Sequence, residues 1–154
     1  MTQTSDRIER SIVLKAPRNR VWQALSDPAE FGTWFRAALA DQRFVPGQAA
    51  RGPITYPGYE HVVMEMQVER MEPERLFSYR WHPYAIDPGV DYSGEPTTLV
   101  EFTLEDVDGG TRLVVVESGF DAIPAARRDE AYRMNSGGWG EQMRNIDAHL
   151  AGKD

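Results

Sequence analysis

Apolar and polar side chains alternate along several segments of the chain, as they do in half-buried β-strands. The alternation is most regular between residues 60 and 70, where Met64 and Met66 share one side and Glu65 and Gln67 share the other. The same period of two predicts further strands over residues 8–15, 76–81, 98–105 and 111–117.

Three other segments repeat their apolar residues every three or four positions, which is typical of amphipathic helices. A short helix after Pro17 carries Val21, Trp22 and Leu25 on one face, and a second carries Phe31, Trp34 and Phe35. A long helix after Pro124 carries Tyr132, Trp139, Met143, Ile146 and Leu150. Two glycines inside that helix, Gly137 and Gly138, indicate a bend or a close approach to another backbone.

The order of these elements predicts an α+β fold. It consists of a curved antiparallel sheet of about seven strands around a long C-terminal helix, with two short helices after the first strand. Residues 44–59 are rich in Pro and Gly, so short strands joined by turns are expected there, and residues 83–96 form one long loop. We expect a single domain over residues 1–154, with flexible ends at 1–6 and 151–154.

The composition narrows the classes of function. The 17 basic and 24 acidic side chains give a net charge of −7, which disfavours binding to nucleic acid. The absence of Cys excludes disulfides, thiolate metal sites and a Cys nucleophile. No segment of the sequence has the length and apolar character of a signal peptide or a membrane span, so a cytoplasmic location is expected.

No familiar catalytic or nucleotide-binding motif is present, and the three His residues, His61, His82 and His149, are isolated from one another in the sequence. We therefore expect no metal and no cofactor. For His61 and His82, an ordinary place at a strand end is favoured over catalysis. His82 follows Trp81, however, which gives it a route to the mouth of a cavity.

Glu117 is the most informative polar residue, because it continues the parity of Leu113 and Val115 on a strand whose apolar side should point inward. The other side of this strand carries Val114 and Val116 and is equally apolar, so both directions stay open for Glu117. A carboxylate on the inward side requires a partner. One interpretation makes it a polar anchor for a ligand or a base. The favoured interpretation is an ordinary one, a salt bridge to an Arg such as Arg80 or exposure at the strand end.

Several short motifs, each unspecific alone, together resemble one known family. They are Ala16-Pro17, Val21-Trp22, Asp27-Pro28, Trp34-Phe35, Arg75-Leu76-Phe77, Gly110-Thr111-Arg112-Leu113, Glu117-Ser118-Gly119-Phe120 and Gly138-Trp139. Over residues 7–150 the chain resembles the bacterial homologues of the activator of heat-shock protein 90 ATPase, in the START-like helix-grip (SRPBCC) superfamily. The resemblance implies a cavity between the sheet and the C-terminal helix. It does not imply one function, because members include lipid binders, polyketide cyclases and a co-chaperone domain.

The leading hypothesis is a non-enzymatic binder of a small hydrophobic or amphipathic molecule in that cavity. The candidate cavity residues are Trp34, Phe35, Met64, Met66, Phe77, Tyr79, Trp81, Phe102, Glu117, Trp139 and Met143. Residues 83–96 form either a lid over the mouth or a solvated loop. Two alternatives stay open: a module that binds a chaperone, and a weak enzyme of the cyclase or hydratase type that uses Glu117, His82 or Tyr79.

Overall fold

The computed structural model describes residues 6–87 and 89–152, and six strands, three α-helices and a short 3₁₀ helix occur in this part of the chain. In chain order they are β1 (Arg7–Leu14), α1 (Arg18–Ser26), α2 (Pro28–Phe35), β2 (Ala49–Pro53), β3 (Val63–Glu72), β4 (Leu76–Trp81), β5 (Thr98–Val107), β6 (Gly110–Ser118), η1 (Phe120–Ala122) and α3 (Ala125–Leu150). Of the ends expected to be flexible, residues 1–5 and 153–154 lie outside the described residues.

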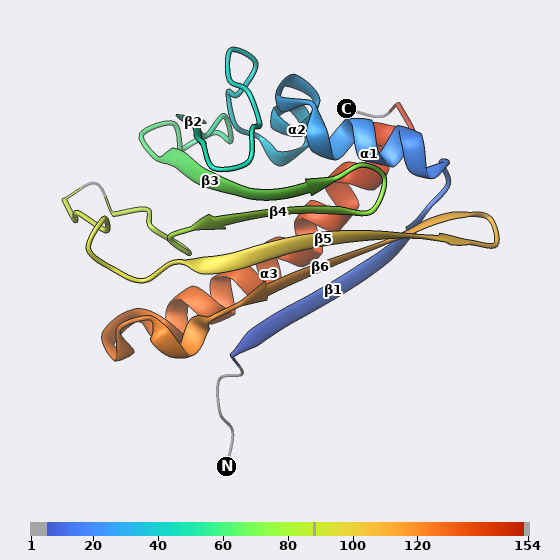
Figure 1. Ribbon diagram of the computed structural model, residues 1–154. Coiled ribbons are helices and arrows are strands. Elements are labelled where there is room, and N and C mark those ends of the chain that lie inside the picture. The colour runs from blue at the N-terminus through green and yellow to red at the C-terminus, as the bar shows by residue number, and fades with distance from the viewer. Residues whose placement is uncertain (1–5, 88, 153–154) are drawn as a thin grey trace.

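The strands form one antiparallel sheet in the order β1-β6-β5-β4-β3-β2, and α3 lies along one face of it (Figure 1). The predicted α+β class is confirmed, but the sheet has six strands where about seven were expected. The difference lies in residues 44–59, of which only Ala49–Pro53 forms a strand. Turns at Gly47 and Gly58, with φ of 87° and 92°, bracket this strand and leave no room for another.

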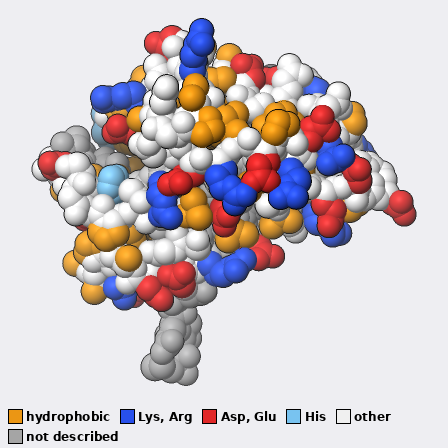
Figure 2. Space-filling view, in the orientation of Figure 1, with side chains coloured by type: hydrophobic (Ala, Val, Ile, Leu, Met, Phe, Trp, Pro, Cys, Tyr) orange, Lys and Arg blue, Asp and Glu red, His pale blue; other side chains and the backbone are white. Residues whose placement is uncertain are grey.

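The strand periodicity predicted from the sequence is reproduced in the burial of the side chains. On β3, Met64 and Met66 are buried, whereas Glu65 and Gln67 are exposed. The exposed side chains of the sheet form ion pairs, including Arg80 with Glu69 on neighbouring strands. Acidic and basic side chains are interspersed on the face of the molecule shown in Figure 2.

The two short helices join each other through one buried hydrogen bond. Asp27 caps α2, where its carboxylate accepts from the backbone N–H of Glu30 at 3.3 Å, and Pro28 occupies the first turn. The indole Nε1 of Trp34 on α2 donates to the backbone carbonyl of Ala24 on α1 at 2.8 Å. Trp34 is therefore fixed in the core by a polar bond as well as by packing.

The long helix α3 runs without interruption for 26 residues. A Cβ atom built on Gly137 or on Gly138 would meet no heavy atom within 4 Å. The expected close approach of another backbone at these glycines is therefore wrong, and they lie beside open space. Gly137 is exposed, whereas Gly138 is half-buried.

Aromatic rings fill most of the volume between the sheet and the helices. Phe31 of α2 lies at the centre, with ring centroids 4.9 Å from Trp34, 6.2 Å from Phe77 and 6.4 Å from Tyr79. Phe102 of β5 contacts the same group and is fully buried. Because these rings pack against one another, any hollow must lie toward the edge of the core.

Candidate functional site

The carboxylate of Glu117 lies at the inner face of β6 and is fully buried. The inward orientation predicted from its parity is confirmed, because Leu113 and Val115 on the same strand are also fully buried. It lies opposite Val100 of β5, next to the pair of Leu99 and Ser118 at the end of the pairing between these two strands.

Four neutral side chains donate hydrogen bonds to this carboxylate. Oε2 accepts from Trp81 Nε1 at 2.7 Å and from Thr98 Oγ1 at 2.5 Å. Oε1 accepts from Trp139 Nε1 at 2.8 Å and from Asn135 Nδ2 at 2.9 Å. Four donors match the four lone-pair positions of an ionised carboxylate. The group is therefore saturated by protein partners.

This arrangement differs from both ordinary interpretations of Glu117 drawn from the sequence. Arg80 pairs with Glu69 on the exposed face of the sheet, with Nε and Oε1 3.0 Å apart, so the expected salt bridge to Glu117 is wrong. Exposure at the strand end is also wrong. Among residues 6–87 and 89–152, no Lys, Arg or His forms an ion pair with Glu117. The buried negative charge is stabilised by neutral dipoles alone.

Tyr79 of β4 carries the second unusual polar group of the core. Its side chain is fully buried, and its hydroxyl has no hydrogen-bond partner among the described residues. Burial raises the pKa of the Tyr79 hydroxyl well above its usual value, and the negative charge of Glu117 raises it further. The phenol therefore stays neutral, which does not favour its action as a base.

Three rings meet beside the Glu117 carboxylate. The centroids of Trp81 and Trp139 are 5.8 Å apart, and Phe35 lies 6.0 Å from the first and 6.1 Å from the second. Both indole N–H groups donate to the Glu117 carboxylate, and these hydrogen bonds fix the orientation of both rings. The carboxylate is thus a positioning group for these rings.

A cavity of about 410 Å³ opens in front of Trp81, at the end of the sheet where β4 enters the 83–96 loop. Its lining consists of Phe35, Ile54, Tyr59, Val62, Val63, Met64, Glu65, Trp81, His82, Tyr84, Ala85, Ile86, Val90, Asp91, Tyr92, Ser93 and Asn135. The volume is within the range of small-molecule sites, and the wall is largely aromatic and aliphatic.

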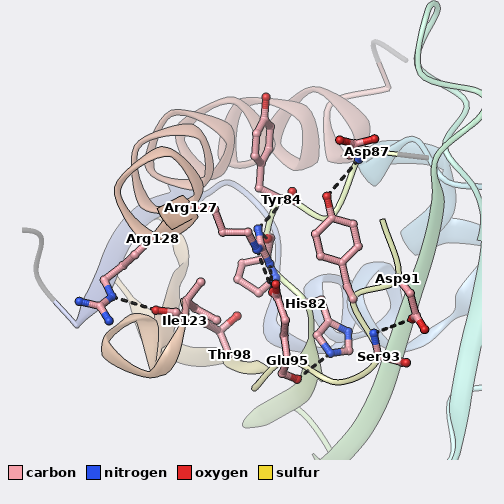
Figure 3. Close-up of polar contacts among 12 residues, drawn as sticks. His82, Tyr84, Asp87, Asp91, Ser93, Glu95, Thr98, Ile123, Arg127 and Arg128 are labelled. Atoms are coloured by element: carbon pink, nitrogen blue, oxygen red, sulfur yellow. Dashed lines mark hydrogen bonds and ion pairs between the residues drawn. The ribbon is translucent and has the colours of Figure 1, made fainter. Parts of the chain in front are cut away.

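The loop wall of this cavity is attached to the first turn of α3 by Arg127. Its Nη1 donates to the carbonyl of Pro83 at 2.8 Å, and its Nε donates to Glu95 Oε1 at 2.8 Å (Figure 3). The guanidinium carbon also lies 4.7 Å from the ring centroid of Tyr92. Arg127 therefore holds the start and the end of the loop together.

Two further bonds shape the loop. His82 Nε2 lies 3.0 Å from the backbone carbonyl of Glu95, so this nitrogen carries the hydrogen. The hydroxyl of Tyr92 accepts from the backbone N–H of Asp87 at 3.2 Å. Tyr84 has a φ of 52°, in the left-handed region, which is rare for a bulky side chain and is a feature of ligand sites as well as of tight turns.

A smaller hollow of about 80 Å³ adjoins this cavity between β4 and α3. Phe35, Trp81 and Asn135 line both spaces, and Gly138, Trp139 and Gln142 complete the smaller one. A third hollow of about 680 Å³, between α2 and β2, is more open to solvent and is lined mainly by short side chains. Because it lacks aromatic walls, we assign the candidate site to the cavity in front of Trp81.

The predicted cavity residues fall into three groups. Phe35, Met64 and Trp81 line the main cavity, and Phe35, Trp81 and Trp139 line the smaller one. Glu117 lies behind these rings and lines neither space. The others are packed in the core: Trp34, Met66, Phe77, Tyr79, Phe102 and Met143.

Sequence reasoning missed two contributions to the site. Asn135 lies three residues after Tyr132 and four before Trp139, so it is on the apolar face of α3. An amide on that face could have been recognised from the sequence as a buried polar group that needs a partner. Thr98 gave no comparable signal. The 83–96 loop was considered as a lid, but no individual residue of it was assigned to the cavity.

Within residues 6–87 and 89–152, no group of three or more carboxylate or His side chains could hold a metal ion. None of the helices described is long and apolar enough to cross a membrane.

Comparisons with known proteins agree with the fold. A protein from Mesorhizobium loti, MLL2253, is 23% identical, with 96% of this chain and 98% of that chain covered and a TM-score of 0.72. A protein from Arthrobacter aurescens is 18% identical, with 95% and 86% covered and a TM-score of 0.75. The Aha1 dimer from Colwellia psychrerythraea is 16% identical, with 94% and 95% covered and a TM-score of 0.66. These similarities show the fold alone.

No curated protein matches the chain at a significant level. The model of one family, described as activator of Hsp90 ATPase homolog 1-like protein, matches residues 15–151. The resemblance drawn from the short motifs is thereby confirmed. The match covers most of the chain, and the chain therefore belongs to the activator of Hsp90 ATPase homolog 1-like family.

Proposed function

We propose that the protein binds a small, largely apolar molecule in the cavity in front of Trp81. The observation that carries the proposal is the construction of the wall. Four parts of the chain enclose about 410 Å³, namely α2, residues 54–65, the end of β4 with the loop after it, and α3. The indole of Trp81 in that wall is oriented by a buried carboxylate. A saturated carboxylate behind a ring costs desolvation energy, which is consistent with a ring whose position matters.

The saturation of Glu117 favours binding over chemistry at this carboxylate. Oε1 already accepts two hydrogen bonds and Oε2 accepts three, so neither has a free lone pair with which to take a proton from a substrate. Tyr79 is fully buried and lines neither cavity. His82 lines the cavity, and its Nε2 is used by the backbone of the loop.

The proposal is tested with prodan, an uncharged dye whose emission depends on its surroundings. The native protein should bind about one prodan per chain, with a Kd in the micromolar range. Ala85→Phe fills the cavity from the loop and Met64→Trp fills it from the sheet, and both should weaken binding at least tenfold. Thr103→Trp, on the exposed face of β5, is the matched control and should bind like the native protein.

A variant can lose prodan binding because its cavity is filled or because its fold is destabilised. Thermal unfolding of the same variants separates these two explanations. If the variants keep their Tm and lose prodan, the cavity is the site. If the native protein binds neither prodan nor any compound of an uncharged hydrophobic library, the proposal is wrong. Native mass spectrometry of protein purified from its own host would then show whether a natural molecule co-purifies.

The family supports a second candidate function, an interaction with a chaperone ATPase. This candidate makes no use of the cavity. It predicts that the protein stimulates the ATPase of the host chaperone equally well with and without the Ala85→Phe substitution. A pull-down and an ATPase assay with that pair distinguish it from the first proposal.

A further inference from the structure

The described lining of the cavity includes two acidic residues, Glu65 and Asp91, and no Lys or Arg. Asp91 Oδ1 accepts from the backbone N–H of Ser93 at 3.0 Å. Hydrogen bonds from the backbone and the side chain of Ser93 hold the pKa of the Asp91 carboxyl below its usual value, so it is ionised at neutral pH. His82 also lines the cavity, and its attraction helps to lower the pKa of the Asp91 carboxyl.

A third negative charge lies behind the wall. Glu117 bonds to Trp81 and to Asn135, which both line the cavity, and no cation among the described residues neutralises it. Its charge is screened little, because the residue is fully buried. The field of this carboxylate therefore acts on whatever occupies the cavity.

Arg127 of α3 contacts the loop, and its charge is paired with that of Glu95. Its Nη2 lies 2.8 Å from Glu95 Oε1, and its guanidinium also faces the ring of Tyr92. It is absent from the cavity lining. The described lining therefore contains two acidic residues and no Lys or Arg.

The neutral groups of the wall add to this preference. Phe35, Tyr59, Trp81, Tyr84 and Tyr92 present ring surfaces, which attract cations through their negative faces. The Nδ2 group of Asn135 must face the Glu117 carboxylate, which leaves Oδ1 to accept a hydrogen bond from elsewhere. The Nε2–H of His82 is used by the backbone carbonyl of Glu95, so this group is not available to donate to a ligand.

From these features we infer that the ligand of the cavity is an organic cation with an apolar body, such as an amine, and not a carboxylic acid or other anion. The inference rests on the proposed function, since it names the chemical class bound at the same site. An aromatic wall, hydrogen-bond acceptors and uncompensated carboxylates are what an amphipathic ammonium group requires. A fatty acid would meet the carboxylates of Glu65, Asp91 and Glu117 and no Lys or Arg in the described lining.

The test uses three probes with the same ring and different charge, 2-naphthylmethylamine, 2-naphthylmethanol and 2-naphthoate, each titrated by calorimetry at neutral pH. The amine should bind at least about tenfold more tightly than the alcohol, and the naphthoate more weakly than either. Raising the salt concentration from 50 to 500 mM should weaken the amine and leave the alcohol unchanged.

Two substitutions identify the charges responsible. Asp91→Asn and Glu65→Gln should each weaken amine binding by about three- to tenfold while leaving alcohol binding unchanged. The matched controls are Asp87→Asn, whose carboxylate makes a similar bond to Gly89 at 3.0 Å without lining the cavity, and Glu69→Gln on the same strand as Glu65. Both controls should change amine binding less than twofold.

The outcomes separate the two proposals. If the alcohol binds as tightly as the amine, or if prodan binds and the amine does not, the cavity proposal stands and the inference about charge is overturned. If neither prodan nor any of the three probes binds, both proposals fail. If the amine binds best and loses its advantage in Asp91→Asn and Glu65→Gln but not in the controls, the inference is supported.

Discussion

Trp81 and Trp139 donate their indole N–H groups to opposite oxygens of one carboxylate, that of Glu117, at 2.7 and 2.8 Å. The two rings come from β4 and α3, so the carboxylate on β6 connects the sheet with the helix. Both indoles also line a hollow, Trp81 the main cavity and both rings the smaller one. The same two side chains therefore form part of the cavity walls and part of the hydrogen-bond network of the core.

Replacement of the carboxylate by an amide should be costly. In Glu117→Gln the new NH₂ group faces two donors, so at least one buried indole or its neighbour loses its acceptor. We expect the free energy of unfolding to fall by about 3 kcal/mol in urea denaturation. Glu105→Gln, which disrupts an exposed pair with Arg112, should change it by less than about 0.5 kcal/mol. A loss below about 1 kcal/mol at Glu117 would contradict the assigned geometry.

Two substitutions of Trp139 separate the contribution of its hydrogen bond to Glu117 from the contribution of its packing in the core. Trp139→Phe keeps an aromatic ring and removes the N–H, so it should cost about 1 to 3 kcal/mol. Trp139→Ala also empties the buried volume and should cost about 3 to 5 kcal/mol. Equal costs for the two variants would show that the hydrogen bond to Glu117 dominates and the ring contributes little.

The exposed glycine of α3 offers a gain in stability. Because a Cβ on Gly137 would meet nothing within 4 Å, Gly137→Ala should raise the free energy of unfolding by about 1 kcal/mol through helix propensity alone. Thermal denaturation monitored by circular dichroism measures the change. A decrease in Tm would mean that the helix needs glycine at this position for a reason that the packing does not reveal.

The loop should depend on Arg127. Arg127→Gln removes the bond to Glu95 and leaves the carbonyls of Pro83 and Tyr84 without their donor. Amide hydrogen exchange over residues 83–95 should accelerate at least tenfold, and prodan should dissociate faster. Arg128→Gln, one residue further along α3, is the control, since Arg128 bonds instead to the carbonyl of Ile123. Unchanged exchange in Arg127→Gln would show that Arg127 does not hold the loop in place.

Acid should weaken one contact between α2 and α3. Burial alone would raise the pKa of the Glu30 carboxyl, but hydrogen bonds from His149 and Arg20 outweigh this effect and lower the pKa below its usual value. A carboxyl with a lowered pKa stabilises the fold above its unfolded pKa and loses that effect as the pH falls through its folded pKa.

Glu30→Gln should therefore cost about 1 kcal/mol near pH 7, and this cost should disappear as the pH falls through the folded pKa of Glu30. Urea denaturation of both proteins at several pH values between 3 and 7 measures the difference. A difference that does not depend on pH would contradict the assignment to the ionised form.

Sequence periodicity predicted the helices and most of the strands, because alternation and helical spacing are local properties. It also offered the inward direction of Glu117, which shares the parity of Leu113 and Val115. The donors to Glu117 were not predictable in the same way. Trp81, Thr98, Asn135 and Trp139 are separated from it by 36, 19, 18 and 22 positions, and only the folded topology brings them together. The sequence offered Arg80 as a partner by charge alone, and the sheet places Arg80 on the opposite face.

The location of the cavity was also beyond the reach of sequence patterns. Aromatic residues that fill the core and aromatic residues that line a hollow share the same periodicity, so Phe77 and Phe102 were grouped with Trp81. What distinguishes Trp81 is its place at the end of β4, next to a loop whose path depends on Arg127, 44 positions from the carbonyl of Pro83.

The most direct test is the indole region of a ¹H–¹⁵N spectrum during a titration with prodan. The chain has four Trp residues, each of which gives one indole signal. The account predicts that the signals of Trp81 and Trp139, assigned with Trp→Phe variants, shift in proportion to bound dye, while that of Trp34, bonded to Ala24 in the core, stays in place. If the protein is saturated with prodan and the Trp81 signal does not move, the dye does not bind in the cavity that Trp81 lines.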